Sequence, residues 1–188
     1  MSDPTPATLR EVVERARAVV VPAVAHAVAT LTVTAARTET LAVYRPPRRT
    51  LLVPRRASFV EVGPVWRLGV LLLGSDGALF ATGSVTRARD PKPTNHTSQS
   101  AEERRELREA ALRAGYGPHD AVNYDAIPLR LDATLGTLGP LVLREGQLTV
   151  SWNGSRTSDS LRPFAGYLAE RVDLAVHPPE GAGETERA

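Results

Sequence analysis

The sequence has no cysteine, few aromatic residues and a single lysine. Of its 188 residues, 5% are aromatic, and every basic residue except Lys92 is arginine. The absence of cysteine excludes disulfides, thiolate zinc sites, iron–sulfur clusters and cysteine nucleophiles. The four histidines are too far apart to place two imidazoles on one helix face, and no glycine-rich phosphate loop occurs. The sequence therefore predicts neither a metal site nor a cofactor.

Composition and length indicate the class of protein. Hydrophobic residues make up 42% of the chain, which excludes a wholly disordered protein. The net charge of +2 is too small to make the whole chain a polyanion binder. Arginine, alanine, valine, glycine and proline are all plentiful, as is typical of GC-rich coding, so we expect a bacterial protein from a high-GC genome. The length predicts one domain over residues 1–176, followed by a flexible tail over 177–188.

The compartment is inferred from what the N-terminal region contains. Residues 1–4 do not have the basic start of a secretory signal. Residues 18–36 are apolar but consist mainly of alanine, valine and threonine, and Pro22 lies within them. A membrane-spanning helix needs about 20 strongly apolar residues. We therefore expect a cytoplasmic protein that does not span a membrane.

Hydrophobic spacing predicts an α+β fold. Apolar residues recur every three or four positions over 9–31, which predicts a long helix kinked or broken at Pro22. The same spacing predicts helices over 100–114 and 161–176. Two apolar runs flank the Asp76-Gly77 turn and predict a hairpin of 65–73 with 78–87. Further strands are expected at 38–44, 50–53, 122–131, 138–144 and 147–152. The overall prediction is a mostly antiparallel sheet built from hairpins, with the three helices packed on one side.

A basic cluster around a predicted hairpin end is the first candidate site. Residues 1–94 carry an excess of positive charge, and residues 95–188 carry an excess of negative charge. The cluster could bind a small anion or a nucleic acid, although nucleic-acid surfaces usually interleave aromatic residues and only Tyr44 and Phe59 lie near. A solvated rim, paired with acidic residues of the same or a neighbouring subunit, is the plainer alternative. The predicted anion-binding residues are Arg45, Arg48, Arg49, Arg55 and Arg56.

A polar loop over residues 87–98 is the second candidate. His96 combined with Asp90 and Ser98 would supply a general base, an orienting carboxylate and a nucleophile if the three met in space. The loop also leads into a predicted helix whose N-terminal amides favour an anion. Its alternative role is an ordered connector in which Ser98 and Ser100 cap the helix. The predicted ligand contacts in this loop are Arg87, Arg89, Lys92 and Asn95.

The two tryptophans form the third candidate. Trp66 and Trp152 lie on predicted hairpin strands, and Arg156 follows the second of them. Tryptophan occurs both in cores and at binding surfaces, because it combines a large apolar body with one donor. We therefore hold two interpretations for these residues, core or subunit-interface packing and the lining of a ligand pocket.

Two segments carry a resemblance to other proteins. The run Val65–Leu73, together with Ser100–Arg108, resembles short actinobacterial proteins of unknown function, some of which are labelled glutaminase. The resemblance covers about a quarter of the chain and assigns no site residue. The chain departs from known glutaminase chemistry, since Arg89 stands three residues before Lys92 where serine-type enzymes have the serine, and cysteine-type enzymes need a nucleophile that is missing.

The sequence as a whole favours a binding protein over an enzyme. We expect a non-catalytic α+β domain that self-associates, as a dimer, through its hairpins or first helix and is able to bind a small anionic or polar ligand. One alternative is a small glutaminase-like amide hydrolase that uses His96. The other is a nucleic-acid-binding accessory protein that uses the arginines of residues 45–56.

Overall fold

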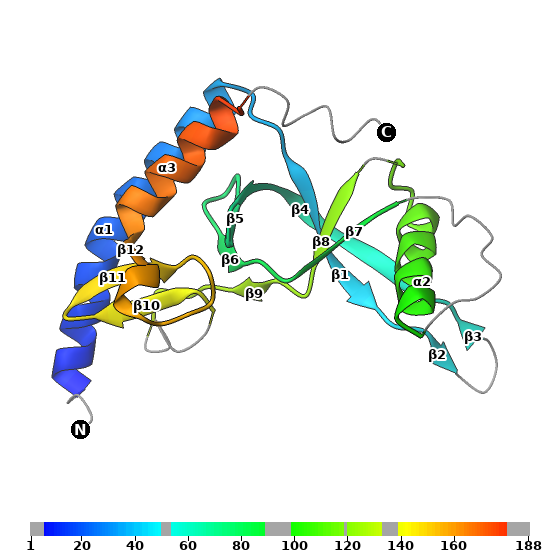
Figure 1. The fold of residues 1–188 in the computed structure, drawn as a ribbon, viewed down its shortest axis with the longest axis horizontal. Coiled ribbons are helices and arrows are strands. Elements are labelled where there is room, and N and C mark those ends of the chain that lie inside the picture. Colours follow the sequence, from blue (N-terminus) through cyan, green and yellow to red (C-terminus); the bar gives the residue numbers. More distant parts are fainter. Residues whose placement is uncertain (1–5, 50–53, 89–98, 119, 133–138, 180–188) are drawn as a thin grey trace. The chain divides into compact units, whose positions relative to one another are not determined.

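The computed structural model describes residues 6–49, 54–88, 99–118, 120–132 and 139–179. Within these residues the chain forms three α-helices, twelve strands and one short 3₁₀ turn (Figure 1), which confirms the α+β prediction. The helices are α1 (Pro6–Val33), α2 (Gln99–Arg113) and α3 (Phe164–Val176). The strands are β1 (Glu39–Arg45), β2 (Arg48–Arg49), β3 (Pro54–Arg55), β4 (Ser58–Leu68), β5 (Leu71–Gly74), β6 (Leu79–Ala81), β7 (Ser84–Arg87), β8 (Ala121–Tyr124), β9 (Ile127–Pro128), β10 (Leu141–Arg144), β11 (Gln147–Ser151) and β12 (Leu161–Pro163).

The chain divides into two compact units. Unit 1 consists of Met1–Arg37, Trp66–Ala81 and Ile127–Ala188, and unit 2 consists of Thr38–Val65 and Thr82–Ala126. The strand order β7-β8-β1-β4-β5-β6-β9 passes through β4, which contributes residues to both units. Because each unit is assembled from segments distant in sequence, no single cut of the chain separates them. One domain over 1–176 stays a prediction, and most of the predicted tail lies outside the described residues.

Unit 1 is built on the buried stripe of α1. The stripe packs against α3, which runs beside α1 in Figure 1, and against the hairpins β5–β6 and β10–β11. Its members follow one another at steps of three or four residues, as expected for one face of a helix. From Ala16 onward they form a continuous apolar core with Leu71, Leu73 and Phe164. The buried α1 residues are Val13, Ala16, Val20, Val24, Ala27 and Leu31.

Helix α1 continues through Pro22 as one long helix, so of the kink or break expected there the break does not occur. Proline removes one backbone hydrogen bond, the one to the carbonyl four residues earlier. For Pro22 this is the carbonyl of Ala18. Both residues lie on the exposed side of the helix. Water can replace the missing donor there, and the helix therefore tolerates the proline. By length and composition α1 is also able to cross a membrane, a test that the core helices of soluble proteins pass as well.

The predicted central hairpin is present but shorter than expected. Strands β5 and β6 pair across the Asp76-Gly77 turn, in which Asp76 Oδ1 accepts a 2.9 Å hydrogen bond from the Ala78 amide. A turn at Gly69, whose φ is +67°, separates β4 from β5. A second interruption at Gly83 separates β6 from β7. The prediction of two unbroken strands was therefore wrong at both glycines.

The last helix starts three residues later than predicted. Residues Leu161–Pro163 form β12, which pairs antiparallel with β11. A residue that precedes proline is pushed towards extended backbone, so Arg162 cannot open a helix readily. Pro163 itself has φ −52° and ψ 133° and stands at the N-terminal cap of α3.

Unit 2 contains four neighbouring strands of the seven-stranded sheet, β7, β8, β1 and most of β4, together with the β2–β3 pair and α2. β1 pairs antiparallel with β4 and parallel with β8, and β8 pairs antiparallel with β7. Three rings, Tyr44, Phe59 and Tyr124, pack with centroids 5.2–5.9 Å apart. They meet Ala110 and Ala111, the buried residues of α2. The parallel β1–β8 pair was not predicted, because it joins residues that lie 82 positions apart in sequence, such as Thr40 and Val122.

Candidate anion-binding site

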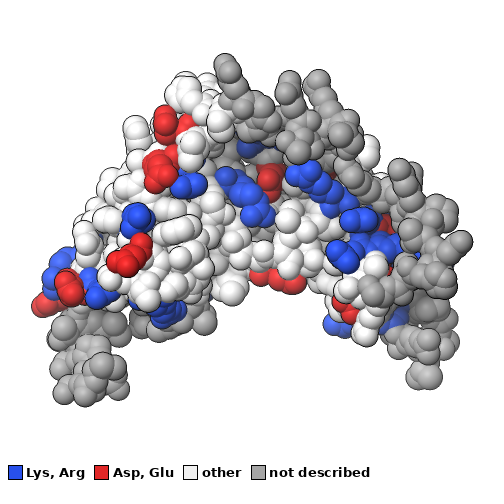
Figure 2. Space-filling model, in the orientation of Figure 1, with Lys and Arg blue, Asp and Glu red and all other residues white. Residues whose placement is uncertain are grey.

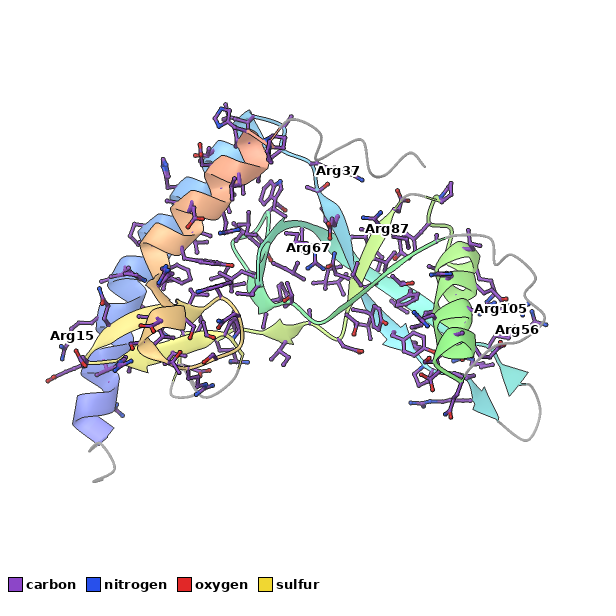
Figure 3. All side chains as sticks on the ribbon, viewed as in Figure 1. Arg15, Arg37, Arg56, Arg67, Arg87 and Arg105 are labelled. Atoms are coloured by element: carbon purple, nitrogen blue, oxygen red, sulfur yellow. The ribbon has the colours of Figure 1, made fainter. Side chains whose placement is uncertain are left out.

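A pocket of about 440 Å³ lies in unit 2, between α2 and the short strands β2 and β3. Its lining includes four arginines and two glutamates and therefore carries a net charge of +2. Basic side chains gather around α2 in Figure 2, and Figure 3 shows Arg56 and Arg105 beside this helix. The lining residues are Pro47, Arg48, Arg55, Arg56, Ala57, Glu106, Glu109 and Arg113.

Strands β2 and β3 bring two arginines together. Arg48 lies directly opposite Arg55 in this antiparallel pair, and Arg56 follows in sequence. Directly opposed like charges destabilise a strand pair. The three side chains are exposed, and none of them forms an ion pair or hydrogen bond with another described residue. An anion bound between these guanidinium groups would offset their repulsion.

Helix α2 fixes the fourth arginine of the pocket. Arg113 Nη2 donates a 3.1 Å hydrogen bond to the carbonyl of Ala57, and its Nη1 lies 3.6 Å from Glu109 Oε2. Glu109 Oε1 in turn accepts a 3.0 Å hydrogen bond from Arg105 Nε. Residues at intervals of four share one helix face, so two guanidinium groups neutralise the charge of Glu109. Arg113 keeps further N–H donors, since a guanidinium has about five.

The other carboxylate of the pocket, Glu106, affects a neighbouring tyrosine. Burial raises the pKa of Tyr44 above its ordinary value of 10.0, and the negative charge of Glu106 raises this pKa further. Arg113 acts in the opposite direction. Tyr44 therefore keeps its proton at neutral pH. Among the described residues Glu106 has no ion pair like those of Glu109 with Arg105 and Arg113, so an anion entering the pocket meets one carboxylate that no arginine neutralises.

The predicted basic cluster is partly assembled at this pocket. Arg48, Arg55 and Arg56 line it, whereas Arg45 is exposed at the end of β1 and is not part of the lining. The side chain of Arg49 lies outside the described residues. The sequence analysis did not include the charged face of α2 in this candidate site. The available signal was the spacing of Arg105, Glu109 and Arg113, but spacing within one helix does not reveal which distant segment faces it.

The predicted polar loop cannot be placed. His96, Asp90 and Ser98, together with Arg89, Lys92 and Asn95, lie outside the described residues. Arg87 is described, at the end of β7. It lines a second pocket of unit 2, of about 350 Å³, together with Arg104 and Arg108 of α2 and with Tyr124.

The two tryptophans of unit 1 have different surroundings. Trp66 is buried in the core, and its indole Nε1 donates a 3.2 Å hydrogen bond to the carbonyl of Ala36. This is the core-packing interpretation of a tryptophan. Trp152 is 48% exposed, at the end of the β10–β11 hairpin, and Arg156 is exposed in the turn that follows.

Metal ligands do not cluster in the described part of the chain. No group of three or more histidine and carboxylate side chains is close enough there to hold a metal ion. His26 is exposed on α1, and His177 Nδ1 lies 3.1 Å from Asp173 Oδ1 one helical turn away. His119 lies outside the described residues.

Comparison with protein family models, with curated proteins and with solved structures finds no match to this chain.

Proposed function

We propose that the protein is a non-catalytic, self-associating α+β domain that binds a small anion in the arginine pocket of unit 2. The observation that carries this proposal is the direct opposition of Arg48 and Arg55 on β2 and β3, with Arg56 and Arg113 beside them. Guanidinium groups bind phosphate and carboxylate through paired, charge-assisted hydrogen bonds. They remain protonated at neutral pH and do not serve as acid–base catalysts, so the pocket is suited to binding rather than to turnover.

The carboxylates of the pocket favour a multiply charged anion over a singly charged one. Glu109 is neutralised by Arg105 and Arg113, which leaves Glu106 as the opposing charge in the lining. A compact, multiply charged group such as pyrophosphate would contact several guanidiniums at once and outweigh one carboxylate. A singly charged anion gains less from the same contacts. We therefore expect inorganic pyrophosphate to bind more tightly than acetate.

Titration calorimetry with inorganic pyrophosphate tests this proposal. Arg56→Ala removes one charge-assisted contact and is expected to weaken binding by about ten- to a hundred-fold. Glu106→Gln removes the opposing charge and is expected to tighten binding by several-fold. The two variants should act in opposite directions, and a misfolded variant cannot produce the gain. Arg45→Ala is the matched control, because Arg45 is an exposed arginine of the same hairpin region that does not line the pocket.

Several results would refute the anion site. If the Arg45→Ala and Arg56→Ala variants lost equal affinity, binding would reflect overall charge and not the pocket. Tight binding of single-stranded DNA, with a steep dependence on salt, would favour the nucleic-acid hypothesis instead. Light scattering tests self-association separately, and a monomer at every concentration would refute that part. Turnover of glutamine that is abolished by His96→Ala would favour the hydrolase hypothesis.

A further inference from the structure

Helix α1 exposes a long surface without charge. From Ala18 to Ala36 the sequence contains no Asp, Glu, Lys or Arg, although much of this segment is outside the core of unit 1. Val21 is 58% exposed and Val33 is 86% exposed. The outward face of a surface helix in a soluble protein is normally charged or polar. This face of α1 therefore has the character of a surface that another structure covers.

Grooves lie along both sides of this face. One, of about 480 Å³, runs between α1 and α3; small residues such as Ala23 and Ala27 line it, and Asp173 and His177 lie at its α3 side. The other, of about 590 Å³, lies between α1 and the β5–β6 turn and is lined mainly by apolar residues such as Val21, with Ser75 and Asp76 of the turn. The exposed residues of α1 thus form a ridge between two hollows. A ridge flanked by hollows can fit a second copy of the same surface.

The ridge is symmetric about one residue. Five of the exposed residues, Ala18, Val21, Ala25, Ala29 and Thr32, form one row at steps of three, four, four and three. The other exposed residues of this segment, Val19, Pro22, His26 and Val33, lie beside the row. This order is the same in both chain directions, and Ala25 is its centre. In an antiparallel pair of α1 helices with a two-fold axis at Ala25, Val21 of one subunit would lie against Ala29 of the other, a large side chain against a small one.

We propose that a second copy of the chain covers this face, through antiparallel packing of two α1 helices with the two-fold axis at Ala25. The proposal rests on the self-association proposed above and adds its location. An interface between identical subunits related by a two-fold axis must be self-complementary, which the symmetric ridge provides. Alanine at the centre lets two helix backbones approach to about 8 Å.

The area needed for a dimer extends beyond the helix itself. Residues 18–33 extend over about 24 Å, and a helix with its side chains is about 10–12 Å wide, so the face of α1 supplies about 250–300 Å² per subunit. A specific interface buries about 1,000 Å² or more in total. The second copy must therefore also contact the groove walls formed by α3 and the β5–β6 turn.

The composition of the ridge favours a second copy over a lipid surface. Helices that lie on membranes carry bulky Trp, Phe or Leu residues on the apolar side, flanked by Lys or Arg. The exposed side of α1 between residues 18 and 33 carries alanine, valine, proline and threonine, with His26 as its one ionisable residue. Small residues favour close contact between helices. A two-fold axis at His26 would bring two imidazoles together, which places the axis at Ala25 instead.

Cross-linking tests the position of the axis. Because the chain has no native cysteine, only the introduced thiols can form a disulfide. Ala25→Cys places two thiols next to each other across the axis, so mild oxidation should give a disulfide-linked dimer as the major species. Neither Val21→Cys nor Ala29→Cys should link to itself efficiently, but a mixture of these two variants should give the linked heterodimer. Gln147→Cys, at the exposed first residue of β11 in the same unit, is the matched control and should remain unlinked.

A second variant tests the same interface without oxidation. Ala25→Glu places two like charges at the axis and is expected to convert the dimer to a monomer in light scattering, with an unchanged circular dichroism spectrum. A wild-type dimer whose Ala25→Cys variant does not cross-link, and whose Ala25→Glu variant stays dimeric, would overturn the location and leave self-association intact. A wild-type monomer would refute both. Flotation of the wild type with phosphatidylglycerol vesicles, abolished by Ala25→Glu, would show that lipid covers this face instead.

Discussion

Tyr44 and Tyr116 make the stability of unit 2 depend on pH in the alkaline range. Burial raises the pKa of both side chains above the ordinary value of 10.0, and the carboxylates Glu106 and Glu61, respectively, raise it further. A raised pKa means that the folded state keeps its proton to higher pH than the unfolded state does. Below about pH 10 both states keep these protons, so the hydroxyls do not change the free energy of unfolding. Above about pH 10 the unfolded state loses these protons before the folded state does, which stabilises the unfolded state.

This property gives a prediction for alkaline conditions. The free energy of unfolding should fall as the pH rises from about 10 towards the folded-state pKa of these tyrosines. In Tyr44→Phe one of the two contributions is missing, so its decline over the same range should be shallower. Urea unfolding followed by circular dichroism at several alkaline pH values measures both slopes. Equal slopes for the wild type and the variant would contradict the role assigned to Tyr44.

Single residues were also where sequence interpretation was most limited. The arginines were identifiable as a basic cluster, but the sequence does not say that Arg48 lies opposite Arg55. The sequence favoured core or interface packing for Trp66 but left a pocket open, and its hydrogen bond to Ala36 shows core packing. The role of a side chain depends on its neighbours in space, and most of these neighbours come from other segments.

At the scale of elements, the turn between β4 and β5 depends on one glycine and one tyrosine. Gly69 has φ +67°, and an added Cβ would overlap the hydroxyl of Tyr167. That hydroxyl accepts a 3.0 Å hydrogen bond from the Val70 amide and donates a 3.4 Å bond to the Leu68 carbonyl. Tyr167 of α3 therefore holds the turn in place, and the turn needs a residue without a side chain.

Substitution of this glycine should be costly. Gly69→Ala is expected to destabilise unit 1 by about 1–3 kcal/mol, from left-handed backbone strain and from the displaced hydroxyl. Gly166→Ala is the matched control, since Gly166 lies in α3 and a Cβ there meets nothing within 4 Å. Alanine in a helix is favoured over glycine by about 0.5–1 kcal/mol, so the control should gain stability. Urea unfolding measures both, and a neutral Gly69→Ala would refute the proposed clamp.

Elements with a strong local signal were predicted well. The long first helix, the Asp76-Gly77 hairpin and the β10–β11 hairpin all follow from periodicity and turn residues within short windows. The errors lie where a proline or glycine had two possible consequences. Pro22 is tolerated because it is exposed, whereas Gly69 ends a strand because Tyr167 occupies the space beside it.

At the scale of the whole molecule, the two units have separate cores. The cluster of unit 1 around Leu31, Leu71 and Phe164 shares no buried residue with the cluster of unit 2 around Phe59 and Val122. Cooperative unfolding is transmitted through shared packing contacts. Separate clusters therefore predict that the two units can open separately.

Hydrogen exchange followed by mass spectrometry tests this prediction. Phe164→Ala is expected to cost about 3–5 kcal/mol and to speed exchange in β5, β10, β11 and α3. Exchange in β8 and α2 should change little. Val122→Ala should produce the reverse pattern. If both variants sped exchange uniformly along the chain, the two units would unfold as one.

The sequence by itself determined the helices, the hairpins, the α+β class and the chemistry excluded by the lack of cysteine. These features depend on local periodicity, turn residues and composition, which short windows of sequence contain. Only the tertiary structure decided the division into two units, the parallel β1–β8 pair and the meeting of the arginine hairpin with Glu106, Glu109 and Arg113. These features join segments far apart in the chain, and no local pattern specifies which distant surface a segment will contact.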